Sequence, residues 1–351
     1  MRSKQYRVAV VGGAGTWGLH YLDAYARHRE CEIVALVDLA KDRRQAIAGQ
    51  YGIPVVYDTV DDLLAKDVPD IVTIALPVAH SPSAVVTCAK AGVKSISCEK
   101  PIAVSLEEAD HMVRVCREQG AALACGTGYW DAPHAIEVAD WIQAGHIGRL
   151  TSASISQGLS PEVSGSGCVD FVLLHALTGM EVQWVEGWCL PPQEDYRTPQ
   201  AQGDLETDCN AYGQLGLGDD VVCHIPEPPV DIVGHIIFLN ICGEDGQVWF
   251  TSHRPILIQG KGAKAMPVFP NFLNRHEPDR WTCVINDLIK TYDRGTEPLC
   301  NGDCYRNALE VAIALKLSDA NHHQRVDLPL QDRSGKIYPR SLRLVGKDAL
   351  G

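Results

Sequence analysis

The feature that most constrains the fold is a glycine-rich turn between a strand and a helix. The β-branched run Tyr6–Val11 predicts a strand, and Thr16–His28 has helical spacing. Gly13 and Gly15 lie between the strand and the helix, and Gly18 lies in the first turn of the helix. Together they have the spacing G-x-G-x-x-G. In this context the first glycine permits a tight turn, the second lets backbone approach a pyrophosphate, and the third allows close helix–strand packing. The turn therefore predicts a dinucleotide site, with phosphates at the helix N-terminus.

The residues around this turn indicate which dinucleotide is bound. Thr16 and Trp17 open the helix, so we expect them beside the phosphates. Asp38 ends the second predicted strand, where a carboxylate can accept hydrogen bonds from both ribose hydroxyls. Because a carboxylate repels a 2′-phosphate, we expect NAD rather than NADP. Arg43 and Arg44 could tolerate that phosphate, but a solvated first helical turn is the interpretation we favour for them.

Strand-like runs alternate with helical stretches over about the first 125 residues. Such alternation is typical of parallel strands joined by right-handed crossovers, with helices on both faces. We therefore predict an α/β class protein whose residues 1–126 form an N-terminal Rossmann domain. The predicted strands are Tyr6–Val11, Glu32–Val37, Ile71–Ala75 and Lys94–Cys98, and the predicted helices are Thr16–His28, Arg43–Gln50, Pro82–Ala91, Leu106–Glu118 and Pro133–Ala144.

After Arg149 the apolar pattern changes to period two, which favours antiparallel strands. We predict that residues 127–351 form a C-terminal α+β domain for substrate binding and oligomerisation, with an open, largely antiparallel sheet. Its last segment is a candidate to pack back on the first domain. The predicted strands are Leu150–Gln157, Val182–Trp188 and a hairpin of His235–Ile241 with Gln247–Thr251, and the predicted helices are Asp279–Arg294 and Cys304–Ala320.

Charge and hydropathy exclude two classes of partner. The formal net charge is −13, whereas a nucleic-acid binder needs a basic face to displace counterions. No apolar run approaches the ~18 residues that span a bilayer, so we expect no membrane partner. The chain starts without an apolar leader, and we expect a cytoplasmic protein.

The 13 cysteines are scattered and odd in number, without paired metal-ligand spacing. Cys300 and Cys304, with His322 and His323 downstream, come nearest to a zinc pattern. Buried small apolar side chains in a reducing compartment are the interpretation that we favour for the cysteines. We therefore predict no metal site.

A second motif, Glu99-Lys100-Pro101, follows the strand Lys94–Cys98 directly. Ligands of open parallel sheets bind beyond the carboxyl ends of the strands. A lysine at this edge can move a proton at a reacting hydroxyl. We therefore expect Lys100 at the chemistry, and both Glu99 and Lys100 beside the cofactor.

Several runs add to the glycine turn and Asp38: Ala75-Leu-Pro77-Val-Ala-His80, Ala91-Gly-Val-Lys94, Cys98-Glu-Lys100-Pro-Ile102, and near the end Ala312–Ser318 and Arg325–Pro329. In this order they resemble the Gfo/Idh/MocA oxidoreductases, the relatives of glucose-fructose oxidoreductase and inositol dehydrogenase. The resemblance spans nearly the whole chain. It implies a Rossmann domain, a second domain with an open sheet, often oligomeric, and reversible nicotinamide-dependent oxidation of a secondary alcohol on a sugar, cyclitol or related polyol. It also implies that Pro77 shapes the cofactor pocket.

The resemblance further implies that Lys100 touches the reacting hydroxyl, and that Tyr129 and Trp130 lie in a substrate-facing loop. The family's helix with Asp-x-x-x-His is altered here, because Asp170 and His175 are five residues apart. Five residues turn a helix by about 140°, so the two cannot share a face without a bulge. The register stays open. We take Asp170 near the site and His175 as its acid–base partner, against a capping role for Asp170 and a polar surface position for His175.

The sequence thus predicts an NAD(P)-dependent dehydrogenase or reductase acting on CH–OH groups of a sugar, cyclitol or related polyol. Lys100 assists proton transfer, and Asp170 and His175 complete the catalytic and substrate-binding set. One alternative is an enzyme that retains NAD and uses transient oxidation for sugar elimination, epimerisation or glycoside cleavage. Another is a non-catalytic nucleotide-binding regulatory protein. We expect a homodimer or homotetramer.

Overall fold

The computed structural model describes residues 5–130, 132–228, 237–251 and 253–347, without the side chains of residues 129, 237 and 238. The chain forms two compact units. Unit 1 contains Met1–Thr127, Pro278–Arg306 and Leu342–Gly351, and unit 2 contains Gly128–Glu277 and Asn307–Ser341. Unit 1 thus takes in two segments that lie after residue 126 in the sequence.

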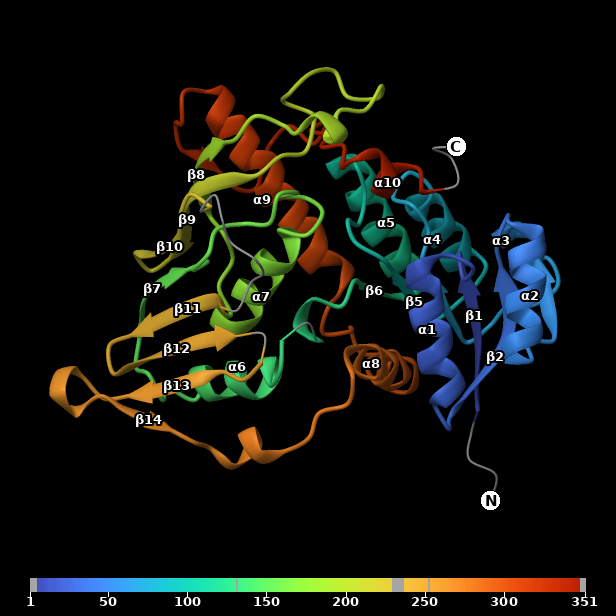
Figure 1. Ribbon diagram of the computed structural model, residues 1–351, viewed down its shortest axis with the longest axis horizontal. Coiled ribbons are helices and arrows are strands. Elements are labelled where there is room, and N and C mark those ends of the chain that lie inside the picture. The colour runs from blue at the N-terminus through green and yellow to red at the C-terminus, as the bar shows by residue number, and fades with distance from the viewer. Residues whose placement is uncertain (1–4, 131, 229–236, 252, 348–351) are drawn as a thin grey trace. The chain divides into compact units, whose positions relative to one another are not determined.

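A six-stranded parallel sheet with the order β3-β2-β1-β4-β5-β6 forms the centre of unit 1 (Figure 1). Because the strand order reverses between β1 and β4, right-handed crossovers place α1 and α4 on opposite faces. This confirms the predicted Rossmann-type fold. The strands are β1 (Tyr6–Val11), β2 (Cys31–Val37), β3 (Val55–Tyr57), β4 (Ile71–Ile74), β5 (Ser95–Cys98) and β6 (Ala122–Cys125).

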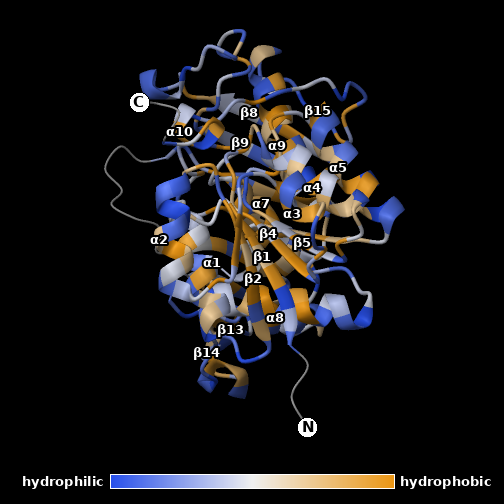
Figure 2. Ribbon diagram, turned by 90° about the vertical axis from the view of Figure 1, so that its right-hand side faces the viewer, coloured by the Kyte–Doolittle hydropathy of each residue, from blue (hydrophilic) through white to orange (hydrophobic). Residues whose placement is uncertain are grey.

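The helices of unit 1 cover apolar strands, which Figure 2 shows side by side in the middle of the fold. The late helix α8 packs on α1, where the Trp281 ring meets the Tyr21 ring edge-on at 4.9 Å. It also reaches β5, since the Ser95 hydroxyl donates to the Leu288 carbonyl over 3.2 Å. The helices are α1 (Thr16–Arg27), α2 (Lys41–Tyr51), α3 (Val60–Leu64), α4 (Ser81–Lys90), α5 (Leu106–Gln119) and α8 (Arg280–Arg294).

Unit 2 is built on a nine-stranded open sheet with the order β14-β13-β12-β11-β7-β10-β9-β8-β15. Among the described strands of this sheet, only β7 and β10 pair in parallel, which confirms the largely antiparallel prediction. The strands are β7 (Leu150–Ser154), β8 (Trp184–Cys189), β9 (Ala211–Gly218), β10 (Val221–Ile225), β11 (Ile237–Gly243), β12 (Gly246–Thr251), β13 (Ile256–Gln259), β14 (Met266–Val268) and β15 (Val326–Asp327).

The predicted hairpin of unit 2 is present, with Gly243 opposite Gly246 across a two-residue turn. Residues 235 and 236 of its first expected strand lie outside the described residues. No helix of the described chain has the length and apolar character needed to cross a membrane. The remaining helices are α6 (Ala135–Gln143), α7 (Cys168–Thr178), α9 (Gly302–Ala320), α10 (Ser341–Leu344), and the short 3-10 helices η1 (Gly128–Trp130), η2 (Glu194–Tyr196), η3 (Gly262–Lys264) and η4 (Asn271–Asn274).

Buried charges in unit 2 have partners inside the fold. The ammonium group of Lys316, on α9, donates to the Thr207 carbonyl over 2.6 Å and to the Cys209 Sγ over 3.2 Å. The fully buried Asp208 accepts from the Ser164 hydroxyl at 2.7 Å and from the Cys209 N–H at 2.8 Å. Burial raises the pKa of Asp208 to about 6. These groups tie α9 and the segment before β9 to the loop before α7.

Candidate active site

The glycine-rich turn sits between β1 and α1, and its backbone leaves no room for side chains at three positions. Gly12 has a φ of 74°, and a Cβ there would lie 2.5 Å from the Ala75 carbonyl oxygen. A Cβ on Gly13 would collide with the Leu36 side chain, and one on Gly18 would collide with the Gly12 carbonyl. The left-handed turn residue is therefore Gly12, whereas Gly13 allows close packing on β2 and Gly18 allows close packing of α1.

The described chain leaves room for a Cβ at Gly15, as expected of a glycine that a phosphate approaches. A Cβ on Gly15 would approach no atom of the described chain closer than 3.4 Å, apart from its own neighbours. Gly15 is also the cap residue of α1 and brings no side-chain acceptor to the first turn. Within the described residues the first turn of α1, which starts at exposed Thr16 and Trp17, has no side-chain cap, so its N–H groups can meet an anion.

Asp38 stands at the carboxyl end of β2, held by two backbone groups. One carboxylate oxygen accepts from the Ala14 N–H over 3.0 Å and the other from the Ala40 N–H over 2.9 Å. The first bond ties the carboxylate to the glycine-rich turn. Each oxygen keeps acceptor capacity for a hydroxyl group. This arrangement suits a ribose diol beside the turn.

Arg44 has a different role from the one expected. Its guanidinium is buried, pairs with Asp58 at 2.5 Å, and donates to the Tyr57 carbonyl over 3.0 Å and to the Asp38 carbonyl. The interpretation as part of a solvated helical turn is therefore wrong for Arg44. Its side chain ties together the ends of β2 and β3, whereas Arg43 is exposed.

Lys100 lies two residues after the end of β5 and is half-buried. Its stem lies beside Gly126, where a Cβ would be 3.3 Å from the Lys100 Cγ and would collide with the Tyr305 hydroxyl. Gly126 has a φ of 60°, so glycine is favoured there by conformation as well as by space. Within the described part of the chain, the Lys100 ammonium has no hydrogen-bond or ion-pair partner.

Glu99 is buried and accepts a hydrogen bond from the Tyr21 hydroxyl over 3.0 Å. Burial and this neighbouring carboxylate raise the pKa of Tyr21 well above its ordinary value. The contact joins the residue after β5 to α1. A direct contact of Glu99 with the cofactor stays a prediction.

Pro77, in the loop after β4, is half-buried and packs close to Gly346. The N–H groups of Val78 and Ala79 donate to the carbonyls of Arg343 and Leu344 over 3.0 and 3.1 Å. A segment near the end of the chain thus covers this loop. Nothing local in the sequence around Pro77 indicates that cover, because its partners are more than 260 residues away.

Asp170 and His175 lie on one continuous α-helix, α7. Their five-residue spacing puts the two side chains about 140° apart, so the structure does not bring them together. Asp170 is buried in the first turn. The His175 Nδ1 lies 3.2 Å from the Met180 carbonyl and 3.6 Å from a Glu181 carboxylate oxygen, beyond the end of the helix.

The predicted substrate loop falls on η1. Trp130 is partly exposed, and the side chain of Tyr129 lies outside the described part of the structure. The roles of both residues stay predictions.

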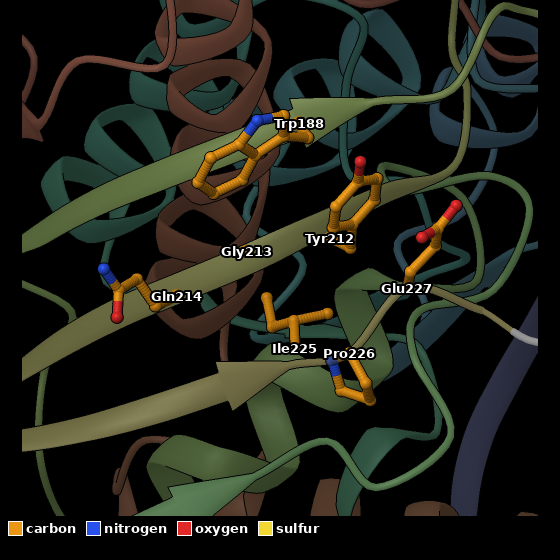
Figure 3. Close-up of a pocket in the computed structure, with 7 residues that line it drawn as sticks. All are labelled: Trp188, Tyr212, Gly213, Gln214, Ile225, Pro226 and Glu227. Atoms are coloured by element: carbon orange, nitrogen blue, oxygen red, sulfur yellow. The ribbon is translucent and has the colours of Figure 1, made fainter.

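A hollow of about 410 Å³ lies on unit 2, across β8, β9 and the end of β10 (Figure 3). The Trp188 and Tyr212 rings stack along its edge with their centroids 5.8 Å apart. The His323 ring stacks on Trp188 with the centroids 4.8 Å apart. The lining is mostly apolar, with Gln214 and Glu227 as polar members.

Comparisons with known proteins agree with this architecture. The model of the oxidoreductase family with an NAD-binding Rossmann fold, Gfo/Idh/MocA, matches residues 6–127. Inositol 2-dehydrogenase of Rhizobium meliloti is 31% identical over 327 residues, which are 89% of this chain and 96% of that protein. D-apiose dehydrogenase of Paraburkholderia graminis is 31% identical over 41% of this chain and 38% of its own length.

Solved structures show the same fold over most of the chain. Aldose-aldose oxidoreductase from Caulobacter crescentus has a TM-score of 0.76 at 20% identity, covering 93% of this chain and 100% of that one. A dehydrogenase from Bordetella pertussis, solved with NADH, has a TM-score of 0.75 at 19% identity, covering 94% and 100%. With the full-length similarity to inositol 2-dehydrogenase, these findings establish that the chain belongs to the Gfo/Idh/MocA oxidoreductase family and is an oxidoreductase of the dehydrogenase type.

Proposed function

We propose that this oxidoreductase interconverts a secondary alcohol and a ketone on a cyclitol, sugar or related polyol, using NAD. The names of its relatives support this substrate class, since they include inositol 2-dehydrogenase, D-apiose dehydrogenase and D-glucoside 3-dehydrogenase. The structural observation that carries the proposal is Lys100. It follows β5 in the same unit as the glycine-rich turn, with an ammonium group unpartnered among the described residues.

The residues of unit 1 fit NAD. Asp38 would accept hydrogen bonds from the ribose hydroxyls, and the open side of Gly15 with the first turn of α1 would hold the phosphates. NAD is favoured over NADP because the Asp38 carboxylate repels a 2′-phosphate and the buried Arg44 is occupied by Asp58 and by backbone carbonyls. A nicotinamide bound there would supply the hydride acceptor, or the hydride donor in the reverse direction.

In the proposed mechanism, the Lys100 Nζ hydrogen-bonds to the reacting hydroxyl. As the uncharged amine, the nitrogen takes the hydroxyl proton while the hydrogen on the same carbon leaves as hydride. In the reverse direction the resulting ammonium group returns the proton. Of the two candidates on α7, we propose Asp170 as the supporting group because it is buried. The His175 Nδ1 is occupied by the Met180 carbonyl, so only its Nε2 could serve.

The test is NADH formation from NAD⁺ by the purified protein across a panel of cyclitols, sugars and sugar acids. Lys100→Met is compared with Lys94→Met, because Lys94 is an exposed lysine just before the same strand. We expect turnover with at least one polyol, lost in Lys100→Met and kept in Lys94→Met, with NAD⁺ binding equal in all three. Equal turnover in both variants would exclude the Lys100 role. Tightly retained NAD without net NADH would favour transient oxidation instead.

We also propose that the chain self-associates through the sheet of unit 2. Ile256, Met266 and Phe269, at the β13–β14 end of that sheet, are 49%, 66% and 73% exposed. Large apolar side chains at an edge strand are typical of interfaces. We expect a dimer or tetramer by sedimentation velocity at micromolar concentration, weakened by Phe269→Ser. A monomer would contradict the proposal.

A further inference from the structure

Three side chains of unit 2 that have no part in the proposed mechanism bring metal-binding atoms together. They are His134, which precedes α6, Glu137 in the first turn of α6, and Glu277, which comes from a distant part of the sequence. One nitrogen and two carboxylate oxygens, one from each residue, all lie within 4.8 Å of one another.

The imidazole of His134 is the observation that points to a ligand. The side chain is only 8% exposed, and its buried Nδ1 has no hydrogen-bond partner in the described structure. A buried polar atom without a partner is rare in proteins and indicates an additional water or ion. The Nδ1 faces a Glu277 carboxylate oxygen at 3.5 Å, without the geometry of a hydrogen bond.

The Glu277 carboxylate is held in place for this arrangement. Its other oxygen accepts from the His134 backbone N–H over 2.8 Å. His134 therefore fixes the Glu277 carboxylate through its backbone N–H and supplies a second ligand atom through its ring. Such support from neighbouring hydrogen bonds is typical of metal ligands.

We propose that His134, Glu137 and Glu277 bind a divalent transition-metal ion, with Zn²⁺ as the best match. Zinc bonds of about 2.0–2.1 Å at a tetrahedral ion separate two ligand atoms by about 3.3–3.4 Å. The observed 3.5 Å between the His134 Nδ1 and the Glu277 oxygen agrees with this distance. The half-exposed Glu137 closes the third position by a side-chain rotation, and water takes the fourth.

The chemistry of the donors favours this class of ion. An imidazole ligand suits Zn²⁺ better than Mg²⁺ or Ca²⁺, which prefer all-oxygen sites. The two carboxylates balance the charge of a divalent ion. The site would join the start of α6 to Glu277, so binding is expected to stabilise unit 2 rather than to take part in hydride transfer.

The experiment is Zn²⁺ titration of the full-length, chelator-treated protein by calorimetry, repeated with Co²⁺ as a spectroscopic probe. The variants are Glu277→Gln and Glu137→Gln, and the matched control is Asp140→Asn, an exposed carboxylate on the same helix. We expect one ion per chain, bound at least about tenfold more weakly by each Gln variant and unchanged in the control. The Co²⁺ spectrum should lack a thiolate charge-transfer band.

Thermal melting of each variant without metal checks that it folds. If Glu277→Gln does not fold, the Zn²⁺ affinity of Glu137→Gln tests the proposal. No stoichiometric binding would overturn the proposal and leave a buried water beside the His134 Nδ1. Binding that all variants share would also overturn it, because the ion would then lie at another site. A thiolate band would overturn it too, because it would place the ion on some of the 13 cysteines.

Discussion

Two lysines in this protein have very different surroundings. Lys316 in unit 2 is only 4% exposed, and its ammonium group donates to the Thr207 carbonyl and the Cys209 sulfur. Lys100 in unit 1 is half-buried at the end of a parallel strand, without a partner among the described residues. A charge that is buried with its partners holds elements together. A charge left open at a strand end is available to a ligand or a reaction.

Two aspartates repeat the contrast. Asp208 is fully buried and accepts hydrogen bonds only from its own fold, including the Ser164 hydroxyl. Asp38 uses two backbone N–H groups to fix its position and stays partly exposed. Variants of these four residues therefore separate structural from functional charges.

The largest effect is expected for Lys100→Met. Losing a group that moves the proton should lower kcat by about 10²–10⁴-fold, while the melting temperature stays that of the wild type. Steady-state NADH formation and thermal melting measure the two quantities. A variant with a much lower melting temperature and an unchanged kcat would contradict this expectation and make Lys100 a structural residue.

Asp208 should affect stability rather than catalysis, and its effect should depend on pH. Its pKa in the folded state, about 6, lies above the ordinary value of 3.8, so the folded state binds the proton more tightly than the unfolded state. The stabilisation from this group is complete below about pH 4 and is lost as the pH rises through 6, by at most about 3 kcal/mol.

Asp208→Asn removes this titration but keeps an acceptor for the Cys209 N–H. The difference in unfolding free energy between variant and wild type should therefore grow in the variant's favour from pH 4 to pH 7, as measured by urea unfolding. A difference that is constant with pH would show that Asp208 is ionised in both states.

Lys316→Met should lower the stability without affecting the chemistry. Methionine fills similar space but leaves the Thr207 carbonyl without its donor, which costs about 2 kcal/mol of unfolding free energy. The urea midpoint measures this loss. Turnover per folded molecule should equal that of the wild type, and a selective loss of turnover would give Lys316 a functional role.

Asp38→Asn should have the smallest effect. The amide keeps one acceptor for the backbone but loses the charge that favours ribose hydroxyls over a 2′-phosphate. We expect about tenfold weaker NAD⁺ binding and a smaller preference over NADP⁺, measured by fluorescence titration. An unchanged ratio of the two affinities would remove Asp38 from cofactor selection.

The parts of unit 1 that carry the site could be predicted because their signals are local. The glycine spacing, the strand before it and the helix after it lie within 23 residues, and β1 has the predicted bounds. The short strands β3 and β6 lack a periodic pattern long enough to detect. The spacing predicts the tight turn at Gly13, whereas the structure has it at Gly12, because spacing alone does not show which glycine has a positive φ.

The rest could not be predicted because it depends on contacts between distant residues. The Lys316–Thr207 bond joins residues 109 apart, and the His134–Glu277 contact joins residues 143 apart. On α7 the run from Phe171 to Leu174 is apolar and buried on all sides, so periodicity gives no preferred face for Asp170 or His175. The roles of those two residues therefore stay predictions.

The discontinuous make-up of unit 1 has a consequence for how the protein is synthesised. Residues 1–127 leave the ribosome long before α8, which covers α1 with Trp281 and reaches β5 through Leu288. Until residue 294 emerges, the nascent Rossmann sheet exposes apolar surface that the finished protein buries. Such a chain is aggregation-prone, and we expect it to depend on chaperones during translation more than a protein with a continuous nucleotide-binding domain.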